Sequence, residues 1–139
     1  HLHYEVETII QARADQVWPL IANGQDWPTW NSTVKSFTGE IAVGNKVGIV
    51  TTDSPDRVNK VKVKSMEAPR HMVMRGGFAP MFWGVRHYDL EVIDAHSCRF
   101  RMWEDYKGLM LPMVAKSLPD FTQAFTDWAQ DLKVAAESR

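Results

Sequence analysis

A series of apolar-alternating segments, followed by one amphipathic segment, constrains the fold of this chain more than any other feature. We expect strands at about 4–11, 33–40, 45–53, 57–67, 70–77, 83–94 and 97–107. Short turn signals separate them, among them Ser54-Pro55-Asp56, Gly76-Gly77 and Asp94-Ala95-His96. Connections this short favour an antiparallel meander over parallel crossovers. The sequence therefore predicts an α+β domain built on a seven-stranded antiparallel sheet.

Helical spacing occurs outside these strands. After the first strand, Val17, Trp18 and Ile21 share one face of a short helix, and residues 26–31 form a second short helical turn or a tight loop. A further helical segment is expected at 109–116. The C-terminal helix carries an apolar stripe at three- and four-residue spacing, made of Phe121, Phe125, Trp128 and Leu132, with Ser117 as the predicted N-cap and Asp120 at its third position. The concave face of the sheet is the expected partner of this stripe.

Length and charge restrict the class of protein. The 139 residues fit one domain, so residues 1–139 are treated as a single unit. A formal net charge of −1 gives no general attraction to nucleic acid, and no segment has the length and apolarity of a membrane span. We therefore expect neither nucleic-acid binding nor stable membrane insertion. With no signal-peptide pattern in the sequence, a cytoplasmic location is expected.

Cysteine and histidine usage predicts no metal site and no cofactor. Cys98 is the only cysteine, so no internal disulfide can form. His71, His87 and His96 show no ligand-like spacing with Cys98 or with acidic residues. By alternation, His71 and His87 fall on the outer face of the sheet, where histidines are common.

The last two predicted strands have complementary residues if the chain turns at Ala95. This register gives three charge-complementary pairs and one apolar pair: Asp89–Arg101, Glu91–Arg99, Arg86–Glu104 and Leu90–Phe100. A slip of two residues would still pair Glu91 with Arg101, so a second register stays open.

Arg86 and Glu104 fall on the inner, helix-facing side of that hairpin. Charged groups are rarely buried unless they are paired, because desolvation costs several kcal/mol for each. One interpretation is an ion pair that only fixes the fold. The interpretation that we favour is the polar end of a ligand cavity, since a few polar groups among apolar walls orient a ligand. The predicted ligand-contacting residues are Trp30, Arg86, Tyr88, Leu90, Phe100, Met102, Glu104, Tyr106, Met113, Phe121 and Phe125.

Lys60, Lys62 and Lys64 alternate with Val61 and Val63 in the fourth predicted strand. The simplest interpretation is a solvated outer face. Attraction of an acidic membrane or an acidic partner is the alternative, which three lysines in a near-neutral protein do not establish.

Four motifs of the chain resemble those of a known superfamily. They are Ala14-Asp15-Gln16-Val17-Trp18, Trp27-Pro28-Thr29-Trp30-Asn31, Arg86-His87-Tyr88-Asp89-Leu90-Glu91 and Glu104-Asp105-Tyr106-Lys107-Gly108. In these motifs and in element order the chain resembles the START-related, pollen-allergen-like SRPBCC superfamily, most of all its polyketide cyclase/dehydrase and lipid-transport branch. The resemblance implies a helix-grip fold. In that fold a curved seven-stranded antiparallel sheet wraps around a long C-terminal helix, and two short helices follow the first strand.

The resemblance also implies a function class. Members of the superfamily bind lipids, polyketides and similar molecules in a cavity between the sheet and the C-terminal helix. We therefore expect a small hydrophobic or aromatic ligand as the partner. A polyketide cyclase or dehydratase remains an alternative, with Arg86 stabilising an enolate and Glu104 or a tyrosine moving the proton. A co-chaperone-like protein-interaction module is a further alternative, and it predicts a sealed interior with an exposed apolar patch. A homodimer stays open without a specific feature to favour it.

Overall fold

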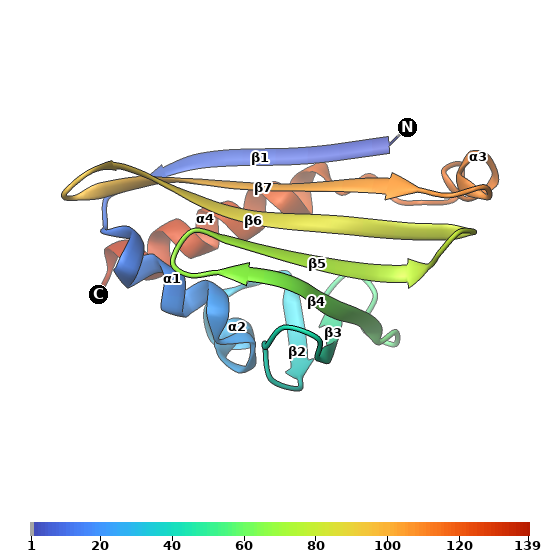
Figure 1. Cartoon of the computed structure of the whole chain (residues 1–139), viewed down its shortest axis with the longest axis horizontal. Helices are drawn as coiled ribbons and strands as arrows, with labels where there is room; N and C mark the ends of the chain where they lie inside the picture. The colour runs from blue at the N-terminus through green and yellow to red at the C-terminus, as the bar shows by residue number, and fades with distance from the viewer. Residues whose placement is uncertain (1) are drawn as a thin grey trace.

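The computed structural model describes residues 2–139 and contains a seven-stranded antiparallel sheet with helices on one face (Figure 1). The strands are β1 (Leu2–Ile10), β2 (Val34–Thr38), β3 (Lys46–Thr51), β4 (Asn59–Glu67), β5 (His71–Phe78), β6 (Phe82–Asp94) and β7 (Ser97–Lys107). Their order in the sheet is β1-β7-β6-β5-β4-β3-β2. From β2 onward each strand therefore lies beside its sequence neighbour, which confirms the predicted meander.

The helices gather on the concave side of the sheet. They are α1 (Ala14–Ala22), the 3-10 turn η1 (Gly24–Asp26), α2 (Trp27–Trp30), α3 (Leu111–Val114) and α4 (Thr122–Glu137). In Figure 1, α4 passes behind β6 and β7, whereas α3 lies at one end of the sheet. A curved sheet around one long C-terminal helix, with short helices after the first strand, is the predicted helix-grip fold.

The start of α4 differs from the prediction. Ser117 is not its N-cap, because the Ser117 hydroxyl donates to the Val114 carbonyl, 3.1 Å away, in the turn that ends α3. The Asp120 carboxylate instead accepts hydrogen bonds from the Thr122 amide (2.9 Å) and the Thr122 hydroxyl (2.6 Å). The helix therefore begins at Thr122, and Asp120 satisfies one of its free amides.

The predicted turn at Gly76-Gly77 is also displaced. β5 continues through both glycines to Phe78, and the Met81 amide closes the turn on the Phe78 carbonyl at 2.9 Å. Gly77 has a φ of +99°, and a Cβ there would lie 2.6 Å from the Phe82 carbonyl oxygen. Glycine is thus needed at this position for a close backbone approach inside a strand.

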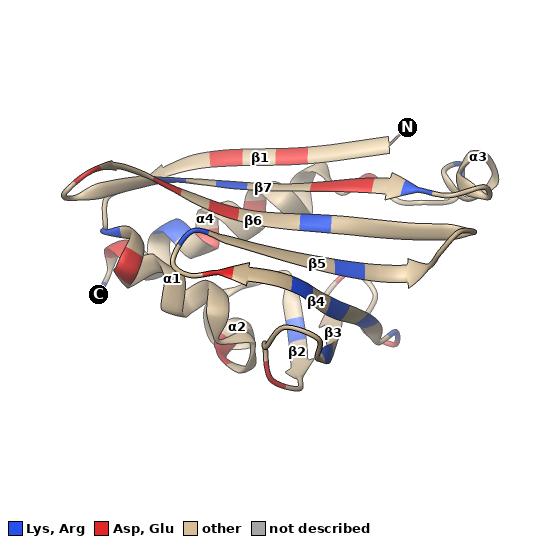
Figure 2. Cartoon of the chain, viewed as in Figure 1, with Lys and Arg blue, Asp and Glu red and all other residues tan. Residues whose placement is uncertain are grey.

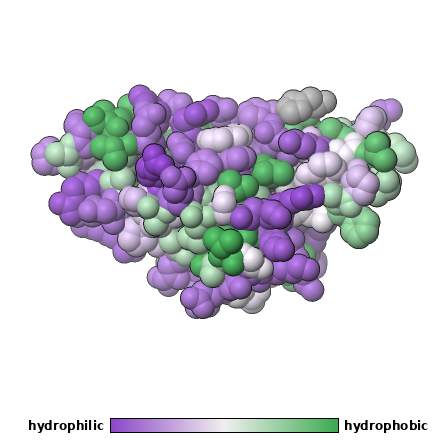
Figure 3. Space-filling model, viewed as in Figure 1, coloured by the Kyte–Doolittle hydropathy of each residue, from purple (hydrophilic) through white to green (hydrophobic). Residues whose placement is uncertain are grey.

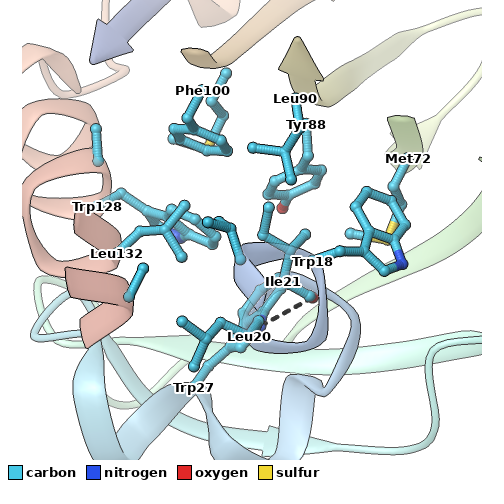
Figure 4. Packing of buried hydrophobic residues seen from close by; sticks show 14 of the residues in the cluster. Trp18, Leu20, Ile21, Trp27, Met72, Tyr88, Leu90, Phe100, Trp128 and Leu132 are labelled. Carbon is cyan, nitrogen blue, oxygen red and sulfur yellow. Dashed lines mark hydrogen bonds between the residues drawn. The ribbon is translucent and has the colours of Figure 1, made fainter. Parts of the chain in front are cut away.

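Aromatic rings fill the core between α4 and the sheet (Figure 4). Trp128 of α4 stacks on Phe100 at 5.6 Å between ring centroids and meets Trp27 edge-on at 5.2 Å. The Trp27 indole N–H donates to the carbonyls of Leu20 and Ile21, each 3.1 Å away, which fixes α2 against α1. This half of the molecule is therefore closely packed.

Candidate functional site

The inner face of the sheet changes from sealed to accessible along the strands. Near α1 and α2, Leu90 is 2% exposed and Phe100 and Met102 are fully buried. Farther along β6 and β7, toward α3, the side chains of Arg86 and Glu104 keep exposed fractions of 25% and 13%. The candidate site is this accessible half of the inner face.

Two glycines lie on the inner face of the sheet beside Arg86 and Glu104. Gly76 and Gly84 are direct partners across β5 and β6, with Val61 and Tyr106 as the next residues in the same cross-strand row. A Cβ at Gly84 would lie 3.1 Å from the Tyr106 ring. A Cβ at Gly76 would lie 2.8 Å from Val61 Cγ1, so the side chains of Val61 and Tyr106 cover the two glycines closely.

The ion pair at the centre of the site confirms the predicted hairpin register. Arg86 and Glu104 are direct partners across β6 and β7, and the Arg86 Nε donates to Glu104 Oε1 at 3.0 Å. The Arg86 guanidinium also lies over the Phe125 ring, 4.7 Å from its centroid. Burial works against the charged guanidinium, but the Glu104 carboxylate and the phenols of Tyr88 and Tyr106 raise the pKa of Arg86 above its ordinary value. Arg86 is a permanent cation in an aromatic environment.

The two phenols of the site keep their protons. Burial, followed by the charge of Glu104, raises the pKa of Tyr106 well above its ordinary value. Burial likewise raises the pKa of Tyr88, whose hydroxyl donates to the Met74 sulfur at 3.8 Å. Both phenols can therefore donate hydrogen bonds near neutral pH, and neither is a base there.

Aromatic rings form a wall beside the ion pair, and Tyr4 is the direct cross-strand partner of Glu104. Tyr4 lies 5.5 Å from Phe121 and 5.7 Å from Phe125, and Tyr106 stacks with Phe121 at 6.2 Å, all between ring centroids. Tyr4 is a residue that the sequence prediction missed. The signal was present, because the alternation of β1 places Tyr4 on the same face as the fully buried Ile10.

The structure separates the other predicted site residues. Arg86, Glu104, Tyr106 and Phe121 come together in the accessible half, and the buried Tyr88 and Phe125 border them from the core side. Leu90, Phe100 and Met102 lie deep in the packed core. Trp30 meets Trp128 edge-on at 5.4 Å, and its buried indole N–H has no hydrogen-bond partner within residues 2–139. The Met113 side chain is 71% exposed on α3, so it stays outside the cluster.

The described residues offer little for thiol or metal chemistry. Cys98 is fully buried, and burial raises the pKa of its thiol to about 11, which makes it a poor nucleophile. Within residues 2–139 no three His, Cys, Asp or Glu side chains are grouped so as to hold a metal ion. Polar recognition at the site depends on Arg86, Glu104 and the phenols.

Comparisons with known proteins agree with this architecture. The sequence matches the family described as polyketide cyclase / dehydrase and lipid transport over residues 1–135. A search of curated proteins found no significant match. No helix within residues 2–139 has the length and apolarity needed to cross a membrane.

Similar solved structures share the fold at low sequence identity. A START superfamily protein from Mycobacterium smegmatis has a TM-score of 0.73 and 13% identity, with 98% of this chain and 97% of that one covered. The di-domain ARO/CYC protein BexL, from the BE-7585A biosynthetic pathway, gives 0.73 and 16%, with 96% and 46% covered. Norcoclaurine synthase from Thalictrum flavum, solved with dopamine and hydroxybenzaldehyde, gives 0.71 and 12%, with 99% and 87% covered.

Proposed function

The chain belongs to the polyketide cyclase / dehydrase and lipid transport family, and from this premise we propose that it binds a small hydrophobic or aromatic ligand between the sheet and α4. The observation that carries the proposal is the Arg86–Glu104 pair, which lies partly accessible on the inner face among aromatic rings. Leaving a charged pair on an apolar face is costly, and orienting a ligand is a reason to keep it there.

Arg86 has donors to spare for a ligand. Its Nε donates to Glu104 Oε1 at 3.0 Å, and a side-chain hydrogen bond also links the guanidinium to the Tyr88 phenol. A guanidinium has five N–H donors, so donors remain for a carbonyl, a hydroxyl or a carboxylate of a ligand. The ligand's apolar body would lie against the rings of Tyr106 and Phe121. This arrangement favours a flat or flexible molecule with one polar end.

The structural neighbours support the ligand class by analogy only. Norcoclaurine synthase was solved with dopamine and hydroxybenzaldehyde, two small aromatic molecules. At 12% identity the likeness extends to the fold, so ligand identity must be measured on this protein.

A direct test uses 8-anilinonaphthalene-1-sulfonate, an aromatic anion whose fluorescence rises in apolar sites. We expect the parent to bind this probe and Arg86→Met to bind it about tenfold or more weakly, because a hydrogen bond to a charged group contributes about 1.5–3 kcal/mol. The matched control is Arg99→Met, which removes the same charge from the outer face, where Arg99 pairs with Glu7 and Glu91. Equal binding by the parent and both variants would refute the assignment of Arg86 as the polar end.

A second candidate function is cyclisation or dehydration of a polyketide-like substrate. The observation that favours it is a permanent cation, Arg86, close to Tyr106, a phenol that retains its proton. Arg86 would stabilise an enolate oxygen while Tyr106 or Glu104 moves a proton. The discriminating measurement is mass spectrometry of a bound polyketide after incubation with the parent, Glu104→Gln and Tyr106→Phe. Turnover by the parent that is lost in either variant, while the variant still binds the compound, would favour an enzyme. A compound that stays unchanged would favour a binding protein without catalytic activity.

A further inference from the structure

Four apolar side chains are exposed together at one end of the molecule. This tip patch consists of Phe78 (74% exposed), Leu109 (74%), Met110 (39%) and Met113 (71%). The β5–β6 turn and the segment from β7 into α3 are joined by backbone hydrogen bonds, from the Leu109 amide to the Pro80 carbonyl (3.0 Å) and from the Met110 amide to the Met81 carbonyl (2.8 Å). Figure 3 shows apolar side chains at this end, around the position of α3 in Figure 1. Single exposed apolar residues are ordinary, but a group of four is informative.

A set of unpaired cations lies beside this tip on the outer face of the sheet. The basic patch consists of Lys46, Lys60, Lys62, Lys64 and Arg75, which line a hollow of about 300 Å³. The register brings them together, because Lys62 is the partner of Lys46 on one side and of Arg75 on the other (Figure 2). None of the five forms an ion pair within residues 2–139, and Arg75 instead lies over Trp83 at 5.2 Å.

Two arginines elsewhere on the outer face are neutralised. Arg99 of β7 pairs with Glu7 and Glu91, and Arg101 of the same strand pairs with Glu5. The chain as a whole has a formal net charge of −1. Uncompensated positive charge is thus concentrated on β3, β4 and β5, where it can attract an anionic surface.

The basic patch and the tip patch have the spacing that a membrane interface requires. Lys60 precedes Val61, the partner of Gly76, so it is level with Gly77, next to Phe78. Arg75 lies three residues before Phe78, which corresponds to about 10 Å along a strand. An interfacial segment buries its apolar face about 5–10 Å into the headgroup and acyl boundary. Lysine and arginine at these positions would therefore reach the phosphates while the tip patch enters the boundary.

We propose that this end of the molecule docks reversibly on an anionic lipid membrane. The tip patch enters the headgroup–acyl boundary, and the basic patch binds the phosphates and carboxylates of the headgroups. A lipid surface fits better than an acidic protein as the partner. An acidic protein would need only the charges of the basic patch, and its binding would leave the tip patch exposed. The inference goes beyond the proposed ligand site and does not rest on it. It places the accessible half of the inner face, around Gly76 and Gly84, at the end that faces the membrane.

The other end of the sheet supplies the controls. Ile9, Val92 and Ile93 are also partly exposed there, with Val92 at 63%. The acidic residues Glu91 and Asp94 flank Val92 and Ile93. Hydrogen bonds from the His96 amide and from the hydroxyl and amide of Ser97 lower the pKa of the Asp94 carboxyl. An anionic membrane would repel this end of the sheet. Val92→Ser therefore replaces an exposed apolar residue by serine, as the tip substitutions do, at the end that should not bind. Arg13→Glu, at the same end, changes the net charge by as much as a lysine-to-glutamate substitution in the basic patch.

The experiment is flotation of the purified protein with vesicles of phosphatidylcholine alone and of phosphatidylcholine mixed with phosphatidylserine. We expect binding to the mixed vesicles only, and binding that falls as salt is raised. Lys60→Glu should weaken it by about fivefold or more, from about 1 kcal/mol for each cation near the surface. Phe78→Ser with Leu109→Ser should abolish it, whereas Val92→Ser and Arg13→Glu should bind like the parent.

Three results would overturn the proposal. The first is no binding of the parent to the mixed vesicles. The second is undiminished binding of the Phe78→Ser, Leu109→Ser variant, which would assign the attraction to charge alone and point to an acidic protein. The third is a loss of vesicle binding in the Arg13→Glu control equal to that in Lys60→Glu, which would show that net charge and not the basic patch determines binding. Because no small ligand enters the experiment, its failure leaves the proposed function of the inner face intact.

Discussion

His71 lies at the centre of a hydrogen-bonded chain on the outer face of the sheet. Its Nδ1 lies 2.7 Å from Asp89 Oδ1, and its Nε2 lies 2.9 Å from His87 Nδ1. The His87 ring in turn stacks on Trp103 at 4.6 Å. Alternation correctly places both histidines on this face. Alternation cannot predict the hydrogen bonds of these histidines, because those bonds depend on the side-chain rotamers and on the residues of the neighbouring strands.

The stability of the protein should depend on pH through this hydrogen-bonded chain of side chains. Burial and the adjacent His71 lower the pKa of His87 below its ordinary value of 6.5, although Asp105 and Asp89 act against this and Lys107 acts with it. The folded state then binds a proton less readily than the unfolded state, so stability is present above the unfolded pKa and is lost as the pH falls. We expect the melting temperature to decrease from about pH 7.5 to about pH 5.5, and to decrease less in His87→Gln.

The control for this prediction is His96→Gln, which removes an exposed histidine in the β6–β7 turn without touching the hydrogen-bonded chain of Asp89, His71 and His87. Thermal unfolding followed by circular dichroism at each pH gives all three profiles. Superimposable profiles for the parent and His87→Gln would contradict the prediction.

At the scale of the elements, the strands and the β6–β7 register followed from the sequence because their signals are local. Period-two alternation and complementary charges act between near neighbours in the chain, and Arg86 and Glu104 met as predicted. The α4 boundary did not follow, since Ser117 and Asp120 are both good N-caps by residue type. Pro119 lies between them, and the turn after α3 engages Ser117 first.

Substitution of the two candidate caps separates them experimentally. Asp120→Ala should lower the melting temperature by a few degrees, because the Thr122 amide loses its acceptor. Ser117→Ala should have almost no effect, since its hydroxyl bonds only a nearby carbonyl in the turn. Circular dichroism at neutral pH measures both changes. The two Thr122 hydrogen bonds lower the pKa of Asp120, so its stabilisation is present above the unfolded pKa and disappears in acid, where the two proteins should converge.

At the scale of the whole molecule, the fold divides into a sealed half and an accessible half. The sequence predicted which residues face inward, because inward and outward positions alternate. It could not predict how completely the interior is filled, since that depends on how rings from α2, β6, β7 and α4 interlock. Leu90, Phe100 and Met102 were predicted to contact a ligand and lie in the sealed half, whereas Tyr4 was missed and lies in the accessible half. The accessible half, the aromatic wall and the tip patch share one end of the sheet.

This division predicts unequal costs for two aromatic truncations on the same C-terminal segment. Trp128 is 3% exposed and touches the rings of Trp27, Tyr88 and Phe100, so Trp128→Ala should lower the free energy of unfolding by about 3–5 kcal/mol. Phe121 is only half-buried, at the start of α4, and Phe121→Ala should cost less than half as much. Urea unfolding, monitored by circular dichroism so that the lost indole does not remove the signal, gives both values. Equal costs would mean that the accessible half is packed as closely as the sealed half, and a ligand would then have no room on the inner face without unfolding part of α4.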